Sequence, residues 1–74
     1  MTPAQSRAAR GLISMTQAGL AKASGLGQST VIDFERERRA VSESAIAAIR
    51  AALEGAGVEF IAENGGGAGV RLRK

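Results

Sequence analysis

Apolar residues recur every three or four positions along the first 54 residues, the spacing that places them on one face of an α-helix. This pattern predicts four helices, over residues 3 to 12 or 13, 17 to 23, 27 or 28 to 35, and 43 to 54. The residues expected on their inward faces are Ala8, Ala9, Leu12, Ile13, Leu20, Ala21, Ala23, Val31, Phe34, Ile46, Ile49 and Leu53. The sequence therefore indicates a mainly α-helical domain.

Residues with strong helix-boundary preferences stand at the predicted helix ends. Residues 2 to 5 have the pattern of a capping box, with Pro3 at the first helical position, where its missing N–H costs nothing. Thr16 is the expected N-cap of the second helix, because its hydroxyl can accept a hydrogen bond from the first turn. Ser42 or Ser44 is the expected N-cap of the fourth helix.

A tight turn joins the second and third predicted helices. Residues 23 to 25, Ala-Ser-Gly, interrupt the helical pattern, and Gly25 tolerates the positive φ that ends a helix. Leu26 is expected to anchor the turn in the core. Two short helices around a turn of about three to four residues that contains glycine form a helix-turn-helix unit.

The last part of the chain changes from a helical to an alternating pattern. Residues 58 to 61 have β character, and residues 69 to 73 alternate apolar and basic side chains after a glycine-rich turn. This pattern predicts a β-hairpin. The apolar side chains expected on one of its faces are Val58, Phe60, Val70 and Leu72.

A two-stranded hairpin is marginally stable in water, so it should pack on the helices or pair with another chain. The alternative is a flexible, glycine-rich tail beyond residue 63. We therefore divide the chain into a helix-turn-helix domain, residues 1 to 56, and a C-terminal β extension, residues 57 to 74, with the second as the expected dimerisation element.

Size and composition narrow the possible functions. A single 74-residue domain has a thin core, so an oligomer would add stability. Ten Lys and Arg against seven Asp and Glu give a net charge of +3, which permits nucleic-acid binding without requiring it. The chain has neither Cys nor His, which excludes a disulfide, a thiolate zinc site and the usual catalytic bases. We expect no enzymatic activity, no cofactor and no bound metal.

The sequence contains no apolar run of the roughly 20 residues that a membrane-spanning helix needs. Its N-terminus also lacks the basic-then-apolar pattern of a signal peptide. We expect a cytoplasmic protein that associates with the nucleoid if it binds DNA. Two Phe are the only aromatic residues, which is too few for a platform that stacks single-stranded bases.

The third predicted helix carries short polar side chains that suit base recognition. Gln28, Ser29 and Thr30 occupy its first turn, and Asp33 follows one turn later. Gln pairs bidentately with adenine in the major groove, Ser and Thr bond to base edges or phosphates, and Asp accepts a hydrogen bond from cytosine N4. We predict that these four residues contact bases, with Thr30 facing a base or a phosphate. The alternative is an ordinary solvated helix face.

Three arginines directly after this helix, Arg36, Arg38 and Arg39, form the densest charge cluster in the chain. Their position predicts contacts with DNA phosphates, which set register and affinity rather than sequence preference. Gln17 is a further candidate for a phosphate contact, because it lies at a helix N-terminus, where backbone N–H groups favour an anion. The alternative for the arginine cluster is a solvated loop.

The run from Thr16 to Arg36 resembles the helix-turn-helix of the lambdoid phage repressor and Cro family, the XRE-type regulators. The resemblance rests on Thr16-Gln17-Ala18, Leu20-Ala21, Ser24-Gly25, Ser29-Thr30-Val31 and Phe34-Glu35-Arg36, and it extends from Arg10 to about Leu53. It implies a four-helix, repressor-like DNA-binding domain. It also implies dimerisation through C-terminal strands and a structural ion pair between Arg10 and Glu35. The alternative for Arg10 is a solvated surface arginine.

These features predict a transcriptional regulator, expected to be a repressor, that binds double-stranded DNA as a homodimer. The two recognition helices of a dimer lie about 34 Å apart, which matches an inverted-repeat operator. The alternative is a protein-binding module on the same fold, an antiactivator or antitoxin-like protein whose partner is another regulator. Asp33 allows this alternative, because a carboxylate in the major groove repels phosphates.

Overall fold

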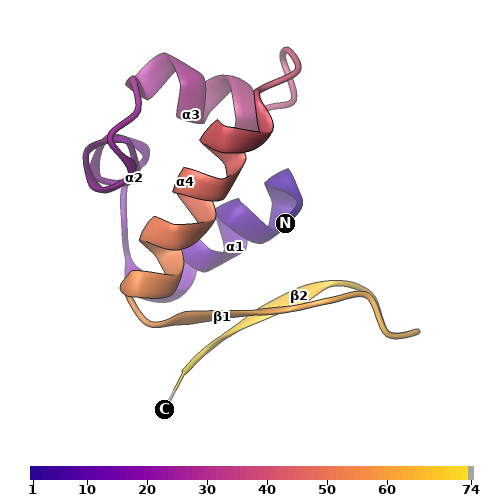
Figure 1. Ribbon diagram of the computed structural model, residues 1–74. Helices are drawn as coiled ribbons and strands as arrows, with labels where there is room; N and C mark the ends of the chain where they lie inside the picture. The colour runs from indigo at the N-terminus through magenta and orange to yellow at the C-terminus, as the bar shows by residue number, and fades with distance from the viewer. Residues whose placement is uncertain (74) are drawn as a thin grey trace.

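The computed structural model describes residues 1–73, which form four helices followed by two strands. The helices are α1 (Pro3–Ile13), α2 (Gln17–Ser24), α3 (Gln28–Glu35) and α4 (Glu43–Gly55), and the strands are β1 (Val58–Ile61) and β2 (Gly69–Leu72). Figure 1 shows α3 at one end of the molecule and the hairpin at the other, with α1 and α4 between them. The predicted fold, helical with a helix-turn-helix and a C-terminal hairpin, is confirmed.

Helices α1, α2 and α4 each begin after a residue whose side chain caps the helix, and α2 ends at a glycine. The hydroxyl of Thr2 accepts a hydrogen bond from the Gln5 N–H, and the Gln5 side chain accepts one from the Thr2 N–H, so the capping box is formed. Thr16 caps α2, and Ser42 is the residue that caps α4. Gly25 ends α2 with a φ of 74°, in the left-handed region that favours glycine.

The hydrophobic core lies between the four helices, and Val58, the first residue of the hairpin, closes it on one side. Leu20, Val31, Ile49, Leu53 and Val58 are fully buried, and they come from α2, α3, α4 and β1. Burying one such side chain contributes about 1.5–3 kcal/mol relative to leaving it exposed. Because isolated helices as short as α2 and α3 are marginal in water, these contacts rather than helix propensity hold the helix-turn-helix in place.

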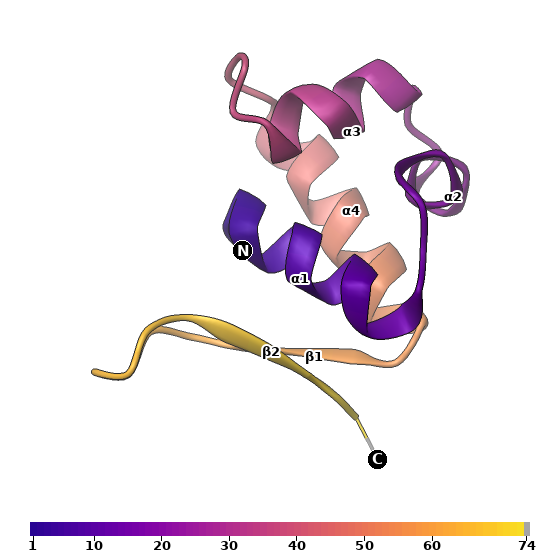
Figure 2. The same ribbon diagram turned by 180° about the vertical axis from the view of Figure 1, so that it is seen from behind.

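The hairpin packs on the helices of its own chain, which is one of the two arrangements that the sequence predicted. Its strands are antiparallel, with Val58 opposite Leu72 and Phe60 opposite Val70, so these four side chains share one face. Val58 is fully buried, Phe60 and Val70 pack against the core, and Leu72 remains 49% exposed. Figure 2 shows the hairpin as a layer beneath α1 and α4.

Polar contacts also fix the hairpin to the helices. The Gln5 amide on α1 donates hydrogen bonds to the carbonyl of Ile61, at 3.2 Å, and to that of Gly69, at 2.9 Å. One side chain therefore bridges both strands at the turn end of the hairpin. On α4, the guanidinium carbon of Arg50 lies 5.2 Å from the centre of the Phe60 ring, within the range of a cation–π contact.

The predicted inward face of α1 was wrong in part. Ala8 and Leu12 were expected in the core but are exposed, as is Ala23 on α2. The face of α1 that turns inward instead contains Gln5 and Ser6, both buried. These polar residues are tolerated in the interior because they have hydrogen-bond partners on the hairpin and on α3. Those partners lie far away in the sequence, so the periodicity of α1 alone could not reveal them.

Candidate nucleic-acid interface

Helix α3 is buried on one face and exposed on the other. Val31, Phe34 and Glu35 form its buried face. Gln28 and Ser29, in its first turn, are exposed to solvent. Two of the predicted base-contacting residues are therefore accessible, and the helix that carries them is held by a tightly packed inner face.

The other two predicted base-contacting residues, Thr30 and Asp33, are partly buried. Asp33 forms an ion pair with Arg39, in which Oδ2 lies 2.8 Å from the Arg39 Nε. The Nη2 of the same guanidinium lies 3.5 Å from the Thr30 hydroxyl. The structure thus brings Arg39, which was predicted as a phosphate contact, onto the side of α3 that carries two predicted base contacts.

Ile32 is a surface residue of α3 that the sequence analysis missed. It is partly exposed, and it is not among the apolar residues that pack against the core in the described part of the chain. A partly exposed apolar side chain on such a helix suits contact with the methyl group of thymine. The sequence carried a signal of this exposure, because Ile32 lies outside the i, i+3 spacing that places Val31 and Phe34 on the inner face of the helix.

The loop after α3 carries the arginine cluster on the surface. Arg36, Arg38 and Arg39 are all exposed. Glu37 has a φ of 56°, and the Arg38 N–H donates to the Asp33 carbonyl at 2.9 Å, so the chain turns sharply at the end of the helix. No ion pair within residues 1–73 involves Arg36 or Arg38.

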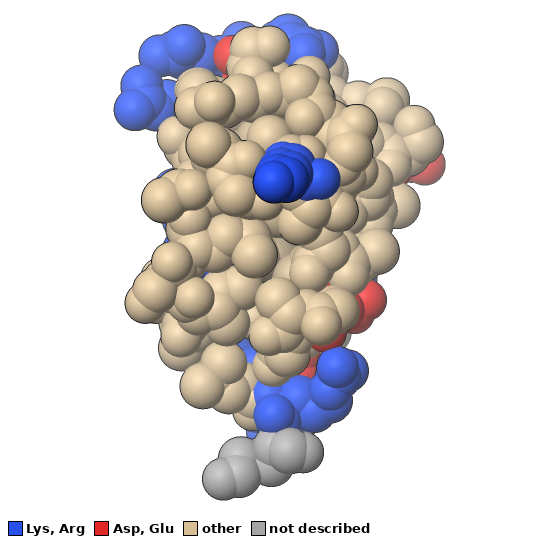
Figure 3. Space-filling model, turned by 90° about the vertical axis from the view of Figure 1, so that its left-hand side faces the viewer, with Lys and Arg blue, Asp and Glu red and all other residues tan. Residues whose placement is uncertain are grey.

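Basic side chains gather at two ends of the molecule. Figure 3 shows one group at the upper end, where α3 and its following loop lie, and another at the lower end beside the hairpin. At the hairpin end, Arg71 lies 3.0 Å from the Glu59 carboxylate, and Arg73 donates to the carbonyl of Glu54. Arg36 and Arg38, which form no ion pair within residues 1–73, are therefore the cations better placed to meet phosphates.

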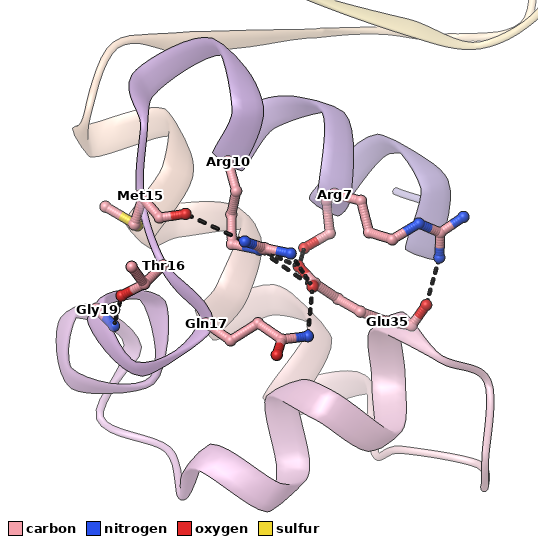
Figure 4. A network of polar contacts seen from close by, with 8 residues as sticks. Arg7, Arg10, Met15, Thr16, Gln17, Gly19 and Glu35 are labelled. Carbon is pink, nitrogen blue, oxygen red and sulfur yellow. Dashed lines mark hydrogen bonds and ion pairs between the residues drawn. The ribbon is translucent and has the colours of Figure 1, made fainter.

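Glu35, at the end of α3, is the centre of a buried hydrogen-bond network (Figure 4). Its carboxylate is fully buried and receives the Arg10 guanidinium, with Nη2 2.7 Å from Oε1 and Nε 2.9 Å from Oε2. Ser6 donates to Oε2 at 2.5 Å, and the Gln17 amide donates to Oε1 at 3.1 Å. Arg7 donates to the Glu35 carbonyl. The network joins α1, α2 and α3 at one carboxylate.

Opposing influences act on the pKa of Glu35. Burial is the largest single influence and raises the pKa, because it disfavours the charged carboxylate. The hydrogen bonds from Arg10, Ser6 and Gln17, with the positive charge of Arg10, act in the opposite direction and outweigh it. The pKa of Glu35 therefore lies below its ordinary value of 4.5, and the carboxylate is ionised at neutral pH.

This shift predicts a dependence of stability on pH. A carboxylate whose pKa is lower in the folded state stabilises the fold above its unfolded pKa, and that contribution disappears as the pH falls through the folded pKa. We expect the free energy of unfolding, measured with urea, to fall as the pH drops below about 4.5. Arg71 also lowers the pKa of Glu59, mainly through its hydrogen bond, so the wild type is compared with Glu59→Gln, which removes this second carboxylate and retains Glu35. The fall in stability should persist in Glu59→Gln, and its absence from that variant would contradict the prediction.

Gln17, predicted as a phosphate contact, lies at the first position of α2, behind its N-cap Thr16. Its side-chain amide donates to Glu35, as described above, so the side chain is held rather than free to reach outward. The Thr16 hydroxyl accepts the Gly19 N–H at 2.9 Å. The part of Gln17 that suits an anion is its backbone N–H, at the positive end of the helix.

Two members of the Glu35 network, Ser6 and Arg7, were missed in the sequence analysis. Ser6 is an ordinary helix residue by sequence, and Arg7 has the pattern of a solvated side chain. A weak signal existed, because Ser6 lies four residues before Arg10 and therefore on the same side of α1. Only the packing of α1 against α3 shows that both residues meet Glu35.

One hollow on the surface of residues 1–73 is small for a ligand site. This hollow of about 120 Å³ is lined by Met1, Gln5, Arg50, Phe60 and Ala62. Ligand pockets are usually about 300–1,000 Å³. Within residues 1–73, no helix is long and apolar enough to span a bilayer. The exposed first turn of α3 and the arginines beside it are the candidate functional site.

A helix-turn-helix family model matches the chain over the residues that build this surface. The match, to domains of the XRE/Cro/C1 type, covers residues 7–60, which include α2, α3 and the loop that follows. None of the curated proteins compared with the chain matches it. The family consists of DNA-binding domains that are typically non-enzymatic. Because the match spans more than half of the 74 residues, the chain belongs to the XRE/Cro/C1-type helix-turn-helix family.

Proposed function

We propose that this protein is a sequence-specific transcriptional regulator, a repressor, that places α3 in the major groove of DNA. The observation that carries the proposal is the division of α3 into two faces. Val31, Phe34 and Glu35 fix its inner face, while Gln28 and Ser29 stand exposed on its first turn. A rigid helix with exposed polar side chains can present hydrogen-bonding groups to base edges in a defined register.

Phosphate contacts would come from the surfaces on either side of α3. Arg36 and Arg38 extend from the loop after the helix, and the N-terminus of α2 at Gln17 adds backbone N–H donors. These contacts position the protein on the duplex and make its affinity depend on salt. The proposed location is therefore the cytoplasm, where the protein would lie on nucleoid DNA.

Gln28→Ala is expected to weaken binding to the preferred DNA site by about 1–3 kcal/mol and to relax base preference at one position. The reason is the loss of a bidentate contact with a base edge. Arg38→Ala serves as the comparison, since loss of a phosphate contact should weaken binding to every sequence and lower the salt slope by about 0.9. Titrations with unchanged affinity and unchanged base preference for Gln28→Ala would contradict its assignment to a base.

We also propose a homodimer that forms through the hairpin. Fewer side chains of the hairpin are available for this contact than the sequence suggested. Val58 is part of the core of its own chain, and Phe60 and Val70 pack against that core. Leu72 remains exposed, and a two-stranded sheet has unpaired backbone groups along its outer edges. The proposed contact is therefore made by these edges and Leu72, and the dimer would bind an inverted repeat.

Leu72→Glu is expected to shift the protein from dimer to monomer, because it places a charge in the proposed contact. The same change at Ala47, an exposed residue of α4, is the control and should leave the dimer intact. Analytical ultracentrifugation over a range of concentrations measures both. Equal dissociation constants for the two variants would exclude the hairpin as the main interface.

A protein-binding role remains the second candidate, and the position of Asp33 favours it, because its carboxylate lies on the side of α3 that would face DNA. The partner would be another regulator. The salt dependence of binding separates the two functions. DNA affinity should fall by about 0.9 log units per log unit of salt for each phosphate contacted, whereas a protein interface gives a shallower slope.

A further inference from the structure

We propose that Arg39 reads a guanine, and that Asp33 is the positioning residue that holds its guanidinium in place. This inference rests on the proposed function, and it changes the roles first predicted for both residues. Arg39 becomes a base contact rather than a phosphate contact, and Asp33 acts through Arg39 rather than on a base itself. The two residues would work as one unit on the exposed side of α3.

The geometry of the pair supports this assignment. The Arg39 Nε lies 2.8 Å from the Asp33 carboxylate, and its Nη2 lies 3.5 Å from the Thr30 hydroxyl. Thr30 and Asp33 are three residues apart, so they lie on one side of the helix, about one turn from each other. The guanidinium therefore turns the edge formed by Nε and Nη2 toward α3. The side chain of Arg39 is nevertheless 53% exposed.

This orientation leaves the other edge of the guanidinium for a ligand. A guanidinium has five N–H donors in a planar fork, and the strong contact with Asp33 uses one of them. Apart from Thr30, residues 1–73 give Nη1 and Nη2 one long contact, 3.5 Å from Nη1 to the Ala40 carbonyl. An arginine fork made by Nη1 and Nη2 matches the O6 and N7 acceptors of guanine, which is the commonest specific contact in the major groove.

The pair is hard to explain by stability or by attraction to phosphate. The side chains of Arg39 and Asp33 are 53% and 22% exposed, and an ion pair with this much solvent access contributes little to folding, because solvent screens it and the long arginine side chain loses freedom. A carboxylate next to a phosphate-binding arginine would weaken that contact by repulsion. A carboxylate that fixes an arginine before binding instead reduces the entropy that the arginine loses on binding. Because the carboxylate also repels phosphate, it favours contact of the arginine with a base edge. Base recognition thus accounts for both members of the pair.

The test uses the 74-residue chain and four variants: Arg39→Ala, Arg39→Lys, Asp33→Asn and Arg38→Ala. Wild-type protein first selects duplexes from a random double-stranded DNA pool, and each variant is then titrated with the best duplex and with single-base changes of it. We expect the wild type to prefer guanine at one position by about 5- to 150-fold. Arg39→Ala should abolish that preference, and Asp33→Asn should reduce it.

Two further readouts separate base recognition from charge. Arg39→Lys keeps the positive charge but lacks the planar fork, so it should keep the salt slope and lose much of the guanine preference. Replacing the guanine by 7-deazaguanine removes the N7 acceptor, so it should weaken binding by the wild type and have no further effect on Arg39→Ala. Arg38→Ala should weaken binding to all duplexes alike, with the guanine preference intact.

The opposite result would overturn the assignment. If Arg39 binds phosphate, Arg39→Ala weakens binding to every duplex equally and Arg39→Lys restores it. In that case Asp33→Asn tightens binding to all sequences, because a negative charge has been removed. A different result, in which the wild type selects no preferred sequence at all, would reject the proposed function itself and the guanine contact with it.

Discussion

Replacing Glu35 by Gln is expected to lower the free energy of unfolding by about 3–5 kcal/mol. The carboxylate is fully buried and accepts hydrogen bonds from Arg10, Ser6 and Gln17. A glutamine would replace one acceptor oxygen by an NH2 donor that faces these donors, and it would leave the largely buried Arg10 cation without an opposite charge. Because small domains are stable by only about 5–15 kcal/mol, much of the variant population should be unfolded or close to unfolding.

Glu54→Gln is the matched control for this prediction, because it makes the same chemical change on the surface. Glu54 pairs with Arg50 four residues earlier in α4, and the two side chains are 41% and 47% exposed. Exposed pairs of this type contribute about 0.3–0.5 kcal/mol. Urea unfolding followed by circular dichroism measures both variants. Similar losses for the two would show that the Glu35 network does not hold the three helices together.

Phe34→Ala is expected to cost about 3–5 kcal/mol of stability, because it removes an aromatic side chain from the core and leaves a cavity. Phe34 is 6% exposed and lies in the same buried cluster as Val31 and Leu20. Its loss should loosen α3 in particular, since this short helix depends on tertiary contacts. Thermal unfolding and hydrogen exchange of α3 amides measure the effect.

Ile32→Ala is the paired variant on the same helix, and it should behave in the opposite way. Ile32 is partly exposed and is not among the residues of the described chain that pack against the core. Its truncation should therefore change stability by less than about 1 kcal/mol. The same truncation should lower DNA affinity if Ile32 contacts a thymine methyl. If Ile32→Ala destabilised the fold as strongly as Phe34→Ala, the two faces of α3 would be wrongly assigned. The comparison therefore tests the orientation of α3 separately from DNA binding.

Local features of the sequence were sufficient to predict the order and type of the elements. Capping residues such as Thr2 and Thr16 act within three residues of their own position, so the sequence shows their hydrogen bonds directly. Gly25 could also be recognised as the turn of the helix-turn-helix, because the positive φ of a glycine depends on that residue alone. The alternation in β1 and β2 likewise predicted which side chains share one face of the hairpin.

Features that depend on contacts across the chain were harder to predict. Gln5 is buried because it bonds to strands more than 50 residues away, and Leu12 is exposed because α1 turns a different side inward. Neither follows from the periodicity of α1. The pairing of Arg10 with Glu35 was available only through the family resemblance, whereas the contact of Arg39 with Asp33 was not predicted at all. Loop side chains reach several neighbours, so only the packed structure shows which one they meet.

The central claim is that α3 recognises a DNA sequence, and selection of random duplex DNA by the purified protein at two salt concentrations tests it most directly. The account predicts recovery of an inverted repeat whose half-sites lie one helical turn, about 34 Å, apart. It also predicts that affinity for the recovered site falls steeply at the higher salt concentration. A pool that is not enriched in any sequence, with binding that barely changes with salt, would contradict the claim.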